Sequence, residues 1–122
     1  TTQSVIQRVR QTIRDPRVSI ETLHESAREA SPISPIDSTA YQRLSETIQR
    51  TFGPVPVAPF TMLGASDAYH YTPLSANVYR FCPVHLDSTD LSRIHGLNER
   101  ISLENLGNML RFYILLMQSW GK

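Results

Sequence analysis

The sequence has almost no net charge and almost no lysine. Its 122 residues include 12 basic and 11 acidic side chains, which gives a formal charge of +1. Because a phosphate-binding surface needs an excess of positive charge, this balance argues against a nucleic-acid partner. Lys122 is the only lysine, so arginine supplies the other basic side chains. Arginine favours bidentate recognition of carboxylate or phosphate, but we interpret this bias as genomic composition.

Cysteine and long hydrophobic runs are also scarce. The single cysteine, Cys82, excludes an internal disulfide and leaves the cellular compartment unknown. We expect its thiol, between Phe81 and Pro83, to be buried and inert. The longest apolar stretch, Phe112 to Met117, is far shorter than the ~20 residues of a membrane span. No secretory leader and no initiating methionine are seen, and we interpret the missing methionine as a sign that the sequence is a piece of a longer one.

The hydrophobic residues that are present make up 40% of the chain, which is typical of a folded protein. Their spacing predicts both helices and strands. Helices are expected at 4–14, at 38–52 and from 99 or 102 to 118, a capped turn at 87–94, and strands at 18–23, 57–63 and 78–81. The predicted fold class is therefore α/β, present in this chain as α+β. Because the last helix is apolar nearly all round after Arg111, we expect most of its faces to be buried.

A segment rich in serine and proline divides the chain. Residues 26–37 contain the dipeptides Ser31-Pro32 and Ser34-Pro35, and each residue before a proline favours an extended backbone. We interpret this segment as a linker. It predicts two parts, residues 1–30 and residues 31–122.

Four histidines are the first candidates for chemistry. His24 and His85 are interpreted as solvated surface side chains, whereas His70 indicates either a binding pocket or a packed corner among its aromatic neighbours. His95 precedes Gly96, which permits a turn that no side chain obstructs. Asn98 and Glu99 are expected to cap the helix that follows. A neutral imidazole on such a loop suits a metal ion when a further group fixes its tautomer.

Motifs for independent catalysis are missing. A catalytic zinc needs about three protein ligands, and the sequence has no HxxxH, CxxC or His-x-Asp motif. The local spacing of Ser66, Asp67 and His70 lacks the G-x-S-x-G turn of an activated serine, and no phosphate-binding glycine loop is present. The residues by themselves therefore give little support for chemistry by this chain alone.

Three stretches nevertheless resemble one family of enzymes. They are 63–71 (LGASDAYHY), 77–83 (NVYRFCP) and 94–102 (IHGLNERIS). In order and spacing they resemble the C-terminal part of the di-zinc aminoacylase, carboxypeptidase and desuccinylase metallopeptidases, and most closely the carboxypeptidase-S-like members. The resemblance implies a fragment of a two-domain zinc exopeptidase fold. Residues 1–30 would be the end of the lid or dimerisation domain, and residues 31–122 the C-terminal segment of the catalytic domain.

The resemblance also implies roles for individual residues. His95 falls on the family's last zinc ligand, and Asn98 and Glu99 fall on the motif that supports the ligand loop. The positions that fall on the substrate-binding loop are Gly64, Ala65, Ser66, Asp67 and Tyr69. The loop departs from the family pattern, because Ala65, Ser66 and Leu97 replace Gly, Thr and Thr. Tyr69 stands where arginine is common, which removes a guanidinium that could bind a carboxylate.

The family's remaining site residues have no counterpart here. The other zinc ligands and the general-base glutamate come from its N-terminal half. The resemblance thus implies a hydrolase of peptide or N-acyl amino acid amide bonds that depends on two zinc ions. This chain would hold none of the catalytic residues of that enzyme and would be inactive alone. Its partners would be that substrate and the missing N-terminal half. The alternative is a non-catalytic module that forms a homodimer through the helix and strand before Ser31, where the orphaned strand Val18 to Leu23 would pair.

Overall fold

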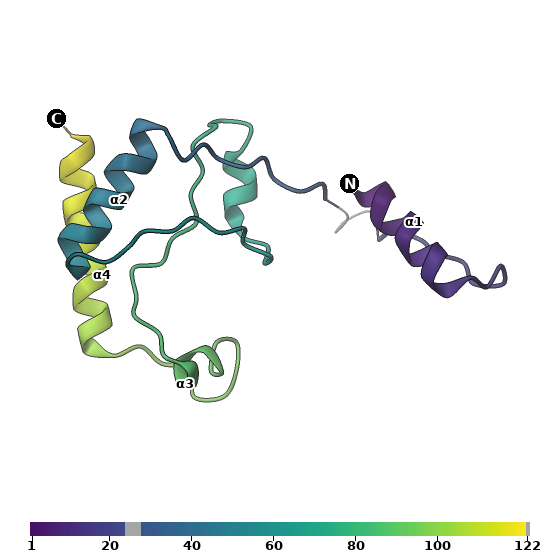
Figure 1. Cartoon of the computed structure of the whole chain (residues 1–122). Coiled ribbons are helices and arrows are strands. Elements are labelled where there is room, and N and C mark those ends of the chain that lie inside the picture. Colours follow the sequence, from purple (N-terminus) through teal and green to yellow (C-terminus); the bar gives the residue numbers. More distant parts are fainter. Residues whose placement is uncertain (24–27, 122) are drawn as a thin grey trace. The chain divides into compact units, whose positions relative to one another are not determined.

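The computed structural model describes residues 1–23 and 28–121, which form two compact units, Thr1–Ile33 and Ser34–Lys122. His24 lies outside the described residues. The elements in chain order are α1 (Thr2–Ile13), α2 (Thr39–Phe52), the 3-10 helix η1 (Asp67–Tyr71), α3 (Ser88–Leu91) and α4 (Leu103–Trp120) (Figure 1). The first unit holds α1 and the second holds the other elements.

The prediction of an α/β fold is wrong, because all regular secondary structure in the described residues is helical and none of it is a strand. The segments expected as strands, 18–23, 57–63 and 78–81, have no regular secondary structure. Their alternating or β-prone side chains favour an extended backbone, but a strand also needs the backbone hydrogen bonds of a neighbour. Alternation in the sequence does not supply that neighbour.

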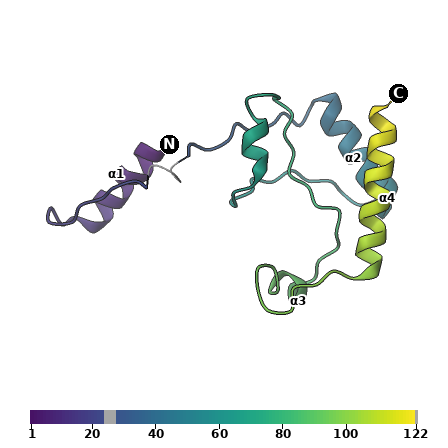
Figure 2. The same cartoon turned by 180° about the vertical axis from the view of Figure 1, so that it is seen from behind.

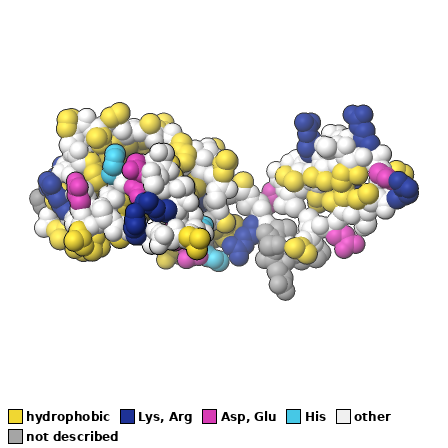
Figure 3. All heavy atoms as spheres, turned by 90° about the horizontal axis from the view of Figure 1, so that it is seen from below, with side chains coloured by type: hydrophobic (Ala, Val, Ile, Leu, Met, Phe, Trp, Pro, Cys, Tyr) yellow, Lys and Arg dark blue, Asp and Glu magenta, His cyan; other side chains and the backbone are white. Residues whose placement is uncertain are grey.

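Helix α1 forms where the sequence predicts it, with a cap at each end. The side chain of Thr1 accepts a hydrogen bond from the backbone of Ser4, and Arg14 closes the helix in the left-handed conformation at φ 52°. None of its residues is buried. The hydrophobic row includes Val5, Val9 and Ile13, which are 62%, 36% and 41% exposed. Figure 3 shows a hydrophobic row on this unit with arginine side chains beside it.

The core of the second unit lies between α2 and α4, which run side by side (Figures 1 and 2). Ser38 caps α2 by accepting a hydrogen bond from the Tyr41 backbone. Ile48 on α2 and Phe112 on α4 are buried, at 6% and 2% exposure. The ring of Phe81 packs at 5.2 Å from the ring of Phe112, so the extended segment before Cys82 also covers this core.

Arginines bind the two helices together in an antiparallel arrangement. Arg43, near the start of α2, donates a hydrogen bond of 3.1 Å to the carbonyl of Ser119 at the end of α4. Arg111 of α4 donates one of 3.0 Å to the carbonyl of Arg50 in the last turn of α2. Each arginine thus donates to a carbonyl in the last turn of the other helix, where the backbone provides no helical donor.

The Ser-Pro segment is tied to the second unit at one end. The Ser34 hydroxyl donates to the carbonyl of Val78 at 2.9 Å and accepts from its N–H at 3.0 Å. The Tyr79 hydroxyl donates to the carbonyl of Pro35 at 2.6 Å. A serine side chain here occupies both backbone groups that a strand neighbour would have bonded.

The last helix is less covered than its sequence predicts. Only Asn105 and Phe112 of α4 are buried, and the expectation that most of its faces are buried is wrong for this structure. Among the described residues, no helix combines the length and hydrophobicity needed to cross a membrane.

Candidate functional site

Residues 64–67 form an exposed segment whose last residue is the first residue of η1. It contains Gly64, Ala65, Ser66 and Asp67. Ser66 has an extended backbone, and its carbonyl accepts the Tyr69 N–H at 3.2 Å to begin the 3-10 turn. The guanidinium Nε of Arg80 donates to the Ser66 hydroxyl at 3.0 Å. An arginine from the 77–83 stretch therefore holds the loop that the 63–71 stretch forms.

Tyr69 and His70 lie on η1 next to this loop. Tyr69 is half-buried and its ring meets the His70 ring edge-on at 5.7 Å. The carbonyl of Tyr69 accepts a hydrogen bond of 2.8 Å from the Thr72 hydroxyl. His70 is exposed, so the structure favours a surface ring contact over a packed corner.

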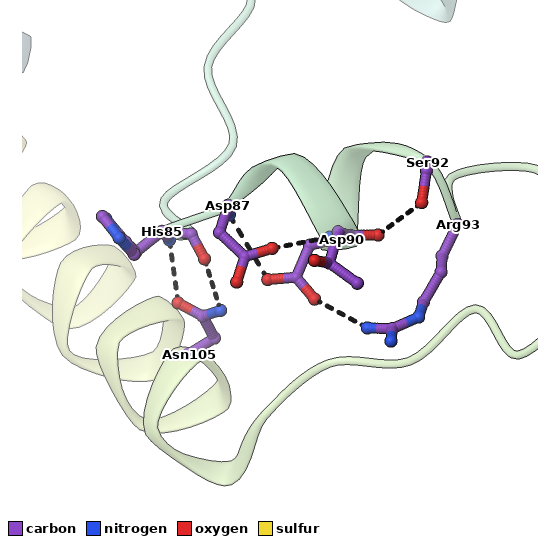
Figure 4. A network of polar contacts seen from close by, with 7 residues as sticks. His85, Asp87, Asp90, Ser92, Arg93 and Asn105 are labelled. Atoms are coloured by element: carbon purple, nitrogen blue, oxygen red, sulfur yellow. Dashed lines mark hydrogen bonds and ion pairs between the residues drawn. The ribbon is translucent and has the colours of Figure 1, made fainter.

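A network of carboxylates and an arginine fixes the turn before His95 (Figure 4). Asp87 caps α3 by accepting the Asp90 N–H at 2.8 Å, and Asp90 accepts the Asp87 N–H in return at 3.4 Å. Arg93 forms an ion pair with Asp90 at 3.3 Å. The hydrogen bond from the Asp90 backbone lowers the pKa of Asp87 below its usual range, with a smaller contribution from the Arg93 charge.

His95 occupies a strained position in this turn. Its backbone is left-handed at φ 58°, and Gly96 donates to the carbonyl of Arg93 at 2.8 Å. A Cβ atom at position 96 would lie 3.2 Å from the Arg93 carbonyl oxygen and 3.3 Å from that of Ser92. A side chain at position 96 would therefore crowd two backbone carbonyls, in keeping with the expected tight turn, whereas the positive φ falls on His95 itself.

Asn98 and Glu99 do not cap the last helix, so that prediction is wrong. Both are exposed in the loop, Asn98 has a left-handed backbone at φ 59°, and α4 begins only at Leu103. Ser102 is the cap, because its hydroxyl accepts the Asn105 N–H at 3.0 Å.

Asn105 is a structural residue that the sequence reasoning missed. Its side-chain oxygen accepts the His85 N–H and its side-chain nitrogen donates to the His85 carbonyl, both at 2.8 Å (Figure 4). It is 8% exposed and lies on the same face of α4 as Phe112, seven residues on. Its position on the core-facing side of an apolar helix was the available signal, because a buried polar side chain needs hydrogen-bond partners.

The described residues do not assemble a metal centre. They contain no group of three or more histidine, cysteine, aspartate or glutamate side chains placed to hold an ion. His95 is exposed and would give a zinc ion one of the roughly three protein ligands it requires, so these residues alone do not fit the metal. Cys82 is exposed rather than buried, which corrects the sequence-based prediction.

Nearly the whole chain is similar in sequence to one group of known proteins. It is 42% identical over 120 residues to "N-fatty-acyl-amino acid synthase/hydrolase PM20D1" of Xenopus tropicalis. It is 36% identical over 121 residues to "Probable carboxypeptidase S-like 2" of Dictyostelium discoideum. The human PM20D1 protein is 36% identical over 122 residues.

These matches cover 98–99% of this chain but only 23–24% of each relative. The chain thus spans about a quarter of the length of the curated relatives that it matches. No family model matches the chain. No solved structure matches it either.

Proposed function

We propose that the chain, which is homologous over nearly its whole length to a segment of PM20D1 and the carboxypeptidase-S-like proteins, forms the C-terminal part of a zinc-dependent hydrolase of amide bonds. The observation that carries this proposal is the 42% identity across 98% of the chain. The substrate would be a peptide or an N-acyl amino acid, which are the classes that the names of the relatives indicate. Residues 1–30 would end the lid domain and residues 31–122 would close the catalytic domain.

His95 is the residue to which we assign metal binding. It would give one imidazole to a zinc centre whose other ligands and general base lie outside this chain. The capped turn of α3 and the close approach of Gly96 to the Arg93 carbonyl hold its backbone in place. Asn98 and Glu99 would support this loop.

Substrate contact is assigned to the loop that Arg80 holds. Gly64, Ala65, Ser66 and Asp67 expose small or polar groups that permit close approach of a ligand. Tyr69 lies beside them on η1 and supplies a half-buried ring where the family commonly has a guanidinium. The bond from Arg80 to Ser66 would keep the loop in one conformation before substrate arrives.

The test is a chimera in which this chain replaces the matched segment of the Xenopus tropicalis relative. The chimera should hydrolyse N-fatty-acyl amino acids, and the 122-residue chain alone should not. His95→Ala in the chimera should lower kcat/KM by about 100-fold or more, because losing a ligand exceeds the effect of losing a supporting group.

The matched control is His85→Ala, since the two hydrogen bonds between His85 and Asn105 involve only the backbone of His85. It should leave kcat/KM unchanged. Hydrolysis by the isolated chain, or equal activity of the His95 and His85 variants, would refute the proposed role.

A second candidate function is a non-catalytic module that forms homodimers through the unit containing α1. It is favoured by the exposed row of Val5, Val9 and Ile13 on a helix with no buried residue. Sedimentation of the isolated chain should then show a dimer that Val9→Asp dissociates and Gln7→Asp does not. A monomer at all concentrations would reject this module.

A further inference from the structure

Helix α4 has two apolar faces, and the second unit covers only one of them. Phe112 faces the core and is 2% exposed. The other face carries large hydrophobic side chains at intervals of three or four residues, a set that we name the outer stripe. Its members, each between 44% and 86% exposed, are Leu103, Leu106, Leu110, Tyr113, Ile114 and Met117. A helix that is apolar on opposite faces is typical of one that is buried on both.

The charge pattern around the outer stripe indicates what kind of body covers it. Glu104 and Arg111 are the only charged residues of α4, and Arg111 is bonded to the carbonyl of Arg50. Two-stranded coiled coils usually place charged residues beside the apolar seam, where they select the partner helix. Here Gly107, Met109 and Leu116 occupy neighbouring positions instead. The pattern suits a broad apolar surface better than one helix of a second copy.

The relatives are longer polypeptides, which offer a source for such a surface. About three quarters of each relative lies outside the segment that this chain matches. We propose that the outer stripe is the surface on which this remaining part of a carboxypeptidase-S-like polypeptide packs. The identity of the occupant rests on the proposed function, whereas the location of the contact rests on the exposure and charge of α4.

Thiol labelling of the same chimera and of the isolated chain tests this contact. Cys82 is exposed, so Cys82→Ser is introduced first. Leu110→Cys then reports on the outer stripe, and Gln118→Cys is the matched position on α4 outside it, exposed in this structure. Maleimide modification at each position is followed by peptide mass spectrometry. Because burial blocks access to the thiol, the cysteine at position 110 should react at least about tenfold more slowly in the chimera than in the isolated chain. The labelling rate of the cysteine at position 118 should be the same in both proteins.

The possible outcomes separate the occupants. Equal labelling of position 110 in both proteins would overturn the proposal. Protection that appears in the isolated chain and grows with its concentration would assign the stripe to a second copy, which also overturns it. Circular dichroism checks that α4 remains helical, and Met117→Cys gives a second reporter if Leu110→Cys does not fold. Hydrolysis by the chimera is measured separately, so a protected but inactive chimera contradicts only the proposed function, and an active chimera labelled rapidly at position 110 contradicts only this inference.

Discussion

At the scale of single residues, Asn105 shows how a side chain can replace backbone pairing. Its two hydrogen bonds to His85 satisfy the N–H and the carbonyl of a segment that no strand accompanies. The hydroxyl of Ser34 does the same for Val78. Buried polar groups that lose such partners destabilise a protein more than the bond itself stabilises it.

Asn105→Ala should therefore lower the free energy of unfolding by about 1–3 kcal/mol, because the two backbone groups of His85 lose their partners. Urea denaturation of the isolated chain measures the change. Gln118→Ala, an exposed change on the same helix, should stay within about 0.5 kcal/mol. A loss for Asn105→Ala no larger than that for Gln118→Ala would contradict the role of the bonds to His85, because alanine is the strongest helix former and does not lower stability through helix propensity.

Asp87 should make the α3 turn sensitive to acid. Its carboxylate accepts the Asp90 N–H, which lowers its pKa in the folded chain. The cap therefore contributes its full stability above the usual aspartate value of about 3.9 and loses it as the pH falls through the lower folded value. NMR titration of the carboxyl carbon should give a midpoint below that usual value.

The Asp87→Asn variant provides the control for this titration. It keeps a capping oxygen that does not ionise in this range. The protection of the Asp90 N–H against hydrogen exchange, taken relative to the intrinsic rate at each pH, should therefore no longer fall in acid. A normal Asp87 titration midpoint would contradict the capping role that the structure gives this residue.

At the scale of elements, the α2–α4 pair depends on arginine geometry as well as on buried hydrophobic surface. The Arg43 guanidinium reaches the Ser119 carbonyl and also lies 5.8 Å from the centre of the Trp120 ring. A lysine carries the same charge but has no planar group. The guanidinium of an arginine can stack on an aromatic ring and at the same time donate hydrogen bonds within its own plane. Arginine is thus used here for helix contacts, which is a structural use of the compositional bias.

Arg43→Lys should lower the free energy of unfolding by about 1 kcal/mol, since one hydrogen bond and one ring contact weaken. A double-mutant cycle with Trp120→Leu should give a coupling energy of about 0.5–1 kcal/mol. Additive effects of the two changes would mean that the ring contact contributes nothing to the pairing of the helices.

The helices were predictable because their signals are local. Ser38 caps α2 and a hydrophobic stripe follows it, so the prediction of 38–52 agrees closely with Thr39–Phe52. The strands were not predictable, because the sequence of Val78 to Phe81 indicates an extended backbone but not whether a neighbour is present. The candidate site was partly predictable. A tight turn at Gly96 follows from the sequence, whereas the left-handed conformation of His95 is not indicated by its residue type. The role of Asn105 depends on its contact with His85, which is 20 residues away in the sequence.

At the scale of the whole molecule, the two units differ in how much they bury. The described residues of α1 contribute nothing to a buried core, whereas α2 and α4 contribute Ile48 and Phe112. Short helices gain most of their stability from tertiary packing. The cooperative core of the isolated chain should therefore be restricted to the second unit.

Hydrogen–deuterium exchange of the isolated chain should then be fastest along α1 and slowest where α2 faces α4. The ratio of the two exchange rates should be large, because α1 can open without losing buried contacts, whereas opening of the α2–α4 pair approaches global unfolding. Peptide-level mass spectrometry measures it. Equal protection of α1 and α2 would show that α1 is stabilised by a contact such as the dimer considered above.

The arginine contacts between α2 and α4 also determine the order in which the second unit can fold. They join residues 76 and 61 positions apart in the sequence, Arg43 with Ser119 and Arg50 with Arg111. Such contacts give a high contact order, and closing the long loop between them must precede the gain from packing. During synthesis α2 emerges well before α4, so the hydrophobic face of α2 stays uncovered until α4 has been made. The rate at which α4 arrives, rather than the helix propensity of α2, should therefore limit how fast this unit forms.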